Sequence, residues 1–150
     1  MSETVEKGPV LKMSRVIPAP PERVFAAWTS REEIKAWFGP DQCRVLEARV
    51  DLRVGGEYYF ALATDRFGKI TLSGQYREIT PPSKLIYTWR WEGNAELAGE
   101  SSLVRVEFIP AGASTEIRLT HEQLPSIESR DDHGHGWSGS FDKLEKYLVG

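Results

Sequence analysis

The sequence has almost no cysteine, no excess of basic residues and no long apolar run. Cys43 is the only cysteine, so the chain forms no internal disulfide, as is usual in a reducing compartment. The formal net charge of -3 argues against nucleic acid or an anionic membrane as a partner, since both select a basic face. No stretch approaches the roughly 20 apolar residues of a membrane span, and residues 1–7 lack the apolar centre of a signal peptide. These absences predict a cytoplasmic protein without membrane insertion.

Aromatic residues, by contrast, are abundant. The chain has 5 Trp, 5 Tyr and 6 Phe among 150 residues, and they cluster rather than spread evenly. A chain of this length is the size of one ordinary domain, which is large enough to bury a sizeable core. We therefore expect a single domain over residues 1–150, with residues 1–8 as a loose lead-in.

The N-terminal part predicts one strand followed by two short helices. Residues Val10–Ile17 alternate and are followed by a proline-rich break, which favours a strand. Pro21–Trp28 has proline in the first turn and apolar residues at helical spacing, which is typical of a short amphipathic helix. Ser30 with Glu33 forms a capping box that opens a second helix, and Gly39-Pro40 ends it.

The central part has a hydrophobic period of two, which is typical of strands with one buried face. Short segments rich in glycine and proline separate these runs, so consecutive strands are expected to pair as an antiparallel meander. The six expected strands are Arg44–Asp51, Glu57–Thr64, Lys69–Thr80, Lys84–Glu92, Leu103–Ile109 and Thr115–Glu122.

The C-terminal part returns to a helical period. Trp137, Phe141, Leu144 and Leu148 fall on one face of a helix that begins near Ser126 or Ser129. The run His-Gly-His-Gly at 133–136 has poor helix propensity, so residues 129–136 are left open as helix or loop. The apolar face of the sheet must be covered, and this is the one long apolar helix available for it. The predicted fold is α+β, with a curved antiparallel sheet of about seven strands around the C-terminal helix.

An ordered set of segments resembles a known family. These segments are "VIPAPPERVFAAWTSREEIKAWFGP", "ARVDLRVGGEYYF", "GQYREITPPSKLIYTW", "VRVEFIPAGASTEIRLTHEQLP" and "GHGWSGSFDKLEKYL". Their order resembles the helix-grip fold of the START-like, or SRPBCC, superfamily, in the branch related to the C-terminal domain of the heat-shock-protein-90 ATPase activator. The resemblance implies a fold and a branch, whereas fold alone does not fix activity.

The aromatic cluster predicts an apolar cavity between the sheet and the C-terminal helix. Five tryptophans are hard to pack around one small core without gaps, and small residues near Gly136 leave space beside the helix. The alternative is a solid aromatic core. The candidate ligand-binding residues are Trp28, Trp37, Phe38, Tyr58, Phe60, Tyr76, Trp89, Trp91, His121, Trp137 and Phe141.

Two polar residues are weak candidates for catalysis. His121 shares a strand face with Ile117 and Leu119, so it should point inward, either as a hydrogen-bonded core residue or as a group that moves a proton. Glu78 would be a buried acid or base if its strand face lines the cavity, and a solvent-facing glutamate otherwise.

The remaining motifs predict neither a metal nor a cofactor. His133 and His135 would point roughly 200° apart on a helix, because one turn takes 3.6 residues. That spacing disfavours a metal site. Cys43 has no histidine nearby in sequence to activate it, which favours a passive role.

Three functions are compatible with these observations. The first is the binding of a hydrophobic or aromatic small molecule in the cavity. The second is a cyclase or hydratase that uses the same cavity with an inward polar pair. The third is a co-chaperone-like module that stimulates a heat-shock-protein-90 ATPase; the resemblance favours it least, because the activator domain is usually joined to a second domain. A homodimer through a sheet edge or the helix is left open.

Overall fold

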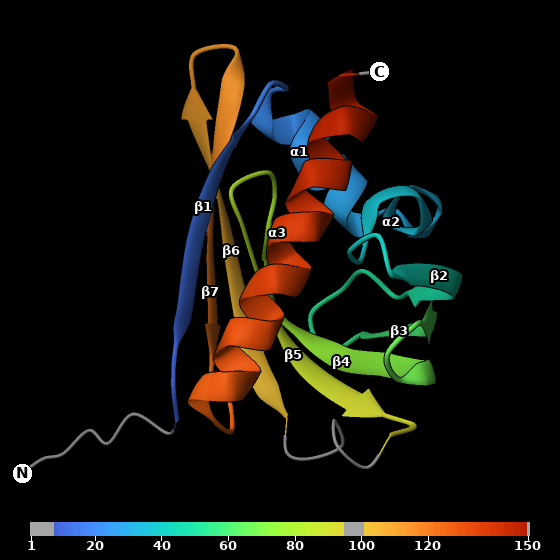
Figure 1. Ribbon diagram of the computed structural model, residues 1–150. Coiled ribbons are helices and arrows are strands. Elements are labelled where there is room, and N and C mark those ends of the chain that lie inside the picture. The colour runs from blue at the N-terminus through green and yellow to red at the C-terminus, as the bar shows by residue number, and fades with distance from the viewer. Residues whose placement is uncertain (1–7, 95–100, 150) are drawn as a thin grey trace, which may run out of the picture.

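The computed structural model describes residues 8–94 and 101–149, which form one curved sheet and three helices (Figure 1). The lead-in was expected over residues 1–8, and residues 1–7 of it lie outside the described residues. The helices are α1 (Pro21–Thr29), α2 (Arg31–Trp37) and α3 (Ile127–Val149). The strands are β1 (Leu11–Ile17), β2 (Cys43–Val50), β3 (Glu57–Thr64), β4 (Gly68–Thr80), β5 (Lys84–Glu92), β6 (Ser102–Ala111) and β7 (Ser114–Glu122).

The seven strands form a single antiparallel sheet in the order β1-β7-β6-β5-β4-β3-β2. Consecutive strands from β2 to β7 pair with each other, as expected for a meander, and β1 closes the far edge by pairing with β7. The sheet curls, and α3 lies across its inner face (Figure 1). The predicted fold class and element order are confirmed.

Alternating side chains place the core between the sheet and α3. On β5, Leu85, Tyr87 and Trp89 are buried, whereas Arg90 is exposed. β6 and β7 continue the same inner face with residues such as Val106 and Leu119. From the opposite side, α3 contributes the buried side chains Trp137, Ser140, Phe141 and Leu144. The period of two in the strands and the helical period in α3 therefore meet in one core.

Helix α3 runs without interruption through the His-Gly-His-Gly segment. The Ser126 hydroxyl accepts a hydrogen bond from the backbone N–H of Ser129 at 3.0 Å and so caps the first turn. The segment left open between helix and loop is therefore helix. Tertiary contacts, such as the hydrogen bond from the Trp91 indole to His133, outweigh the low local propensity of this segment.

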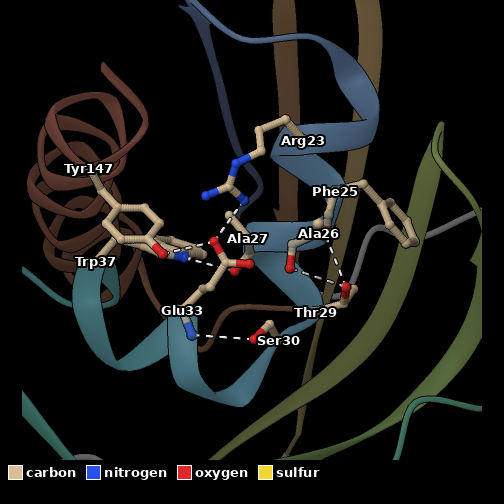
Figure 2. Close-up of polar contacts among 9 residues, drawn as sticks. All are labelled: Arg23, Phe25, Ala26, Ala27, Thr29, Ser30, Glu33, Trp37 and Tyr147. Carbon is tan, nitrogen blue, oxygen red and sulfur yellow. Dashed lines mark hydrogen bonds and ion pairs between the residues drawn. The ribbon is translucent and has the colours of Figure 1, made fainter. Parts of the chain in front are cut away.

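The two short helices are fixed to each other and to the C-terminal end of α3 (Figure 2). Glu33 on α2 forms a 2.7 Å ion pair with Arg23 on α1. It also accepts a hydrogen bond from the Tyr147 hydroxyl on α3 at 2.8 Å. The indole of Trp37 donates to the Ala27 carbonyl at 2.9 Å, and Ser30 caps α2. These contacts hold α2, and with it the segment that follows α2, against α1 and the C-terminal end of α3.

Candidate functional site

A cavity of about 440 Å³ lies between the N-terminal half of α3 and the strands β3, β4 and β5. Its volume falls within the range of about 300–1,000 Å³ that is usual for small-molecule sites. The buried part of its lining is almost wholly apolar and forms the floor. The floor consists of Phe38, Gly39, Leu62, Ile70, Trp89, Trp137 and Ser140.

Exposed polar side chains surround the opening of this cavity. Arg66, from the β3–β4 turn, forms a 3.5 Å ion pair with Asp132 on α3, so the pair spans the opening. Arg66 also lies over the ring of Phe67, with its guanidinium carbon 4.7 Å from the ring centre. The exposed residues of the rim are Gln42, Asp65, Arg66, Asp132 and His135.

The segment after α2 packs directly on α3 and forms one wall. The backbone N–H of Gly39 donates to the buried Ser140 hydroxyl at 2.8 Å. Gly39 has a φ of 89°, a conformation that glycine adopts without strain. Gly139 lies so close to Pro40 that an added Cβ would stand 2.7 Å from the Pro40 Cβ. The small residues of α3 therefore allow this segment to reach the helix and to present Phe38 to the cavity.

Replacing Gly139 with alanine is expected to destabilise the protein by about 1–3 kcal/mol, because the added methyl group overpacks this contact. Urea unfolding measures the change. Gly134→Ala on the same helix is the matched control, since its Cβ would meet only Leu11 Cδ1 at 3.4 Å. The control should be as stable as the unmodified protein or more stable, because alanine is the better helix former. A Gly139→Ala variant as stable as Gly134→Ala would contradict the close packing.

His121 is bonded through both ring nitrogens inside the core. The Trp137 indole donates to His121 Nδ1 at 3.2 Å, so this nitrogen is the acceptor. Nε2 therefore carries the proton and donates to Ser102 Oγ at 2.7 Å, and Ser102 in turn donates to the Trp89 carbonyl at 3.3 Å. His121 is fully buried, and it does not line the cavity. Its geometry is that of a neutral, structural histidine.

His133 forms a second pair of the same kind at the wall of the cavity. Its Nδ1 donates to the Ser129 carbonyl at 2.7 Å, and its Nε2 accepts from the Trp91 indole at 3.0 Å. The two imidazole rings lie 4.8 Å apart. Burial, and then the neighbouring His133, hold the pKa of His121 well below its usual value, and burial lowers the pKa of His133.

The structure brings only four of the sequence-derived candidates to the cavity: Phe38, Trp89, Trp91 and Trp137. Five others surround a separate void of about 20 Å³, which is close to solid packing. These five are Trp28, Trp37, Tyr58, Phe60 and Tyr76. Phe141 is buried beside Trp137 and, like His121, lines neither space.

Glu78 lies away from the cavity. The pairing of β4 with β5 shifts between Tyr76 and Glu78, and this bulge turns the glutamate to the outer face. There it accepts a hydrogen bond from Thr80 at 2.9 Å and pairs with Lys84 at 3.3 Å. The Thr80 hydroxyl, and then Lys84, lower the pKa of Glu78. His121 and Glu78 are therefore not brought together as an acid–base pair.

Several lining residues carry no recognisable signal in the sequence. Arg66 and Phe67 belong to a turn, and Cys43 begins an edge strand, where periodicity says little about direction. Burial raises the pKa of the Cys43 thiol, which keeps it protonated and weakly nucleophilic. His133 is the exception, because a histidine at i−4 from the inward Trp137 falls on the same helix face.

The described residues show neither a metal-ligand cluster nor a membrane-spanning helix. They contain no group of three or more His, Cys, Asp or Glu side chains placed to hold a metal ion. Within residues 8–94 and 101–149, no helix is both long and apolar enough to cross a membrane.

Comparison with known proteins identifies the relatives of this fold. A sequence profile of the family described as Activator of Hsp90 ATPase homolog 1-like protein matches residues 18–149. The AHSA1 protein from Silicibacter pomeroyi superposes with a TM-score of 0.83 at 26% identity, covering 94% of this chain and 98% of that one. A protein from Chromobacterium violaceum superposes with a TM-score of 0.78 at 26% identity, covering 93% of this chain and 96% of that one. A protein from Nitrosomonas europaea superposes with a TM-score of 0.78 at 26% identity, covering 93% of this chain and 94% of that one. No curated protein matches the sequence significantly.

Proposed function

The chain belongs to the family of Activator of Hsp90 ATPase homolog 1-like proteins, and we propose that it binds a hydrophobic or aromatic small molecule between α3 and the sheet. The family has, in general, a ligand-binding fold. The single observation that carries the proposal is a cavity of about 440 Å³ whose buried floor is apolar. Burying an apolar ligand against such a floor gains roughly 25 cal/mol for each Å² removed from water.

The proposed binding residues are the four aromatic side chains that line the cavity. Phe38 lies against Trp89 and Trp137, with ring centres 5.9 and 6.2 Å away. Trp91 meets Trp89 edge-on at 5.5 Å. Flat rings placed among these walls can stack or meet an edge, the two arrangements that aromatic pairs prefer. The inner aromatic residues, such as Trp28, support these walls from behind.

A tryptophan-fluorescence screen tests this function, because three of the five tryptophans line the cavity. Lipids, polyketides and aromatic metabolites should be titrated against the protein, and saturable quenching by an aromatic or hydrophobic class is expected. No saturable signal across the library would contradict the proposal. If the protein instead accelerated ATP hydrolysis by a heat-shock protein 90 while binding nothing, the co-chaperone interpretation would replace it.

A further inference from the structure

Trp89 has a buried indole N–H that finds no acceptor among the described residues. The side chain is 5% exposed, and its Nε1 is the one buried side-chain nitrogen or oxygen there that lacks a partner. Native cores satisfy most such groups, so an unsatisfied donor calls for an explanation. The Trp89 side chain lines both the cavity and the small inner void, so this buried donor belongs to a residue that separates the two spaces.

The other four tryptophans all have partners for their N–H groups. Trp28 donates to the Tyr87 hydroxyl at 3.2 Å, and Trp37 to the Ala27 carbonyl at 2.9 Å. Trp91 and Trp137 donate to the two histidines described above. Trp89, at the cavity wall, is therefore the one tryptophan whose N–H has no acceptor among the described residues.

The two nearest imidazoles have no acceptor to spare for Trp89. The ring centres of His121 and His133 lie 5.0 and 6.0 Å from that of Trp89. The acceptor nitrogen of each is already used, by Trp137 and by Trp91 respectively. Among the described residues, the acceptor for Trp89 is therefore missing, and a bound molecule can supply it.

The charges around the cavity favour an uncharged ligand. The floor contains no ionisable side chain, so an ionised group there would lose its hydration without a counter-ion. At the rim, Asp65 and Asp132 face one cation, Arg66, which is already paired with Asp132. This balance disfavours an anion such as a carboxylate.

We propose that the ligand is an uncharged aromatic molecule with a hydrogen-bond acceptor of the ketone type, and that Trp89 Nε1 donates to this acceptor. The inference rests on the proposed function and names its ligand class. Because the nitrogen is buried, the acceptor reaches it through a side-chain adjustment of the kind that accompanies complex formation.

Calorimetric titration with fluorenone and fluorene tests the inference, because the two molecules differ mainly in one carbonyl. The protein is expected to bind fluorenone about two- to tenfold more tightly than fluorene, which corresponds to the net contribution of one neutral hydrogen bond. Trp89→Phe should reduce the affinity ratio to about one. Trp37→Phe is the matched control: it removes an indole whose N–H is bonded to the Ala27 carbonyl and which does not line the cavity, so the ratio should persist.

The outcomes separate this inference from the proposed function. Equal affinity of the unmodified protein for both compounds would overturn it, and would indicate that a water in the small void satisfies the nitrogen. Tighter binding of a fluorenone carboxylate than of fluorenone would overturn the uncharged ligand class. Binding of neither compound would overturn this inference, whereas only the absence of a saturable signal across the whole fluorescence library would overturn the proposed function.

Discussion

Replacing Gly136 with phenylalanine is expected to weaken ligand binding strongly while leaving the protein folded. Gly136 lines the cavity, and an added Cβ would meet no atom within 4 Å. It shares a face of α3 with Asp132, His133 and Ser140, all of which also line the cavity. A phenyl group at this position therefore fills the space that a ligand would occupy. We expect affinity to fall by about tenfold or more, which corresponds to about 1.4 kcal/mol.

Two alanine variants control for the helix itself. Gly134→Ala and Gly136→Ala should each stabilise the protein by up to about 1 kcal/mol, because glycine is the weaker helix former. Gly134 does not line the cavity, so its variant should bind ligands unchanged. The comparison requires calorimetry for affinity and urea unfolding for stability. Undiminished binding by a folded Gly136→Phe variant would place the ligand elsewhere.

Mild acid is expected to destabilise the protein before its carboxylates are protonated. His121 and His133 are held neutral in the folded state, with pKa values lowered by burial, while both titrate near 6.5 in the unfolded chain. Below this pH the unfolded chain binds more protons than the folded one, so the free energy of unfolding falls as pH falls. The loss is at most about 1.4 kcal/mol per pH unit for each histidine.

Urea unfolding between pH 7.5 and 5 measures this loss, because the window lies above the usual range of carboxylates. Protonation of carboxylates also lowers the free energy of unfolding, but only at lower pH. His121→Gln should lessen the slope, since glutamine takes up no proton, although the variant is less stable at every pH. His135→Gln, which removes an exposed histidine from α3, the helix that carries His133, should keep the slope. Stability that stays constant from pH 7.5 to 5 would contradict the buried, neutral pairs.

Most of the fold was predictable because its signals are periodic. The alternation of Leu85, Tyr87 and Trp89 against Ile86 and Thr88 identifies an inward face without knowledge of any partner strand. The path of α3 through residues 133–136 was not predictable in this way. The helix is stabilised by contacts with segments distant in sequence, such as Gly139 with Pro40 and His133 with Trp91. Local helix propensity does not include such contacts.

The site was less predictable than the fold. Hydrophobicity shows that Trp28 and Trp89 both face inward, but it does not show which of them borders empty space. That difference depends on tertiary placement, such as the position of the β3–β4 turn, whose residues 65–67 line the cavity. Glu78 shows a second limit, because one bulge after Tyr76 moves the glutamate to the outer face. Neither the turn's position nor the bulge has a signature in the sequence.

The most direct test of the central claim is a crystal structure of the protein with the tightest aromatic ligand found by fluorescence. The account predicts ligand density enclosed by Phe38, Trp89 and Trp137, beneath the Arg66–Asp132 pair, with α3 still continuous from Ile127. Density in the groove on the outer face of the sheet, near Arg49 and Arg90, with the cavity closed by its own side chains, would contradict it.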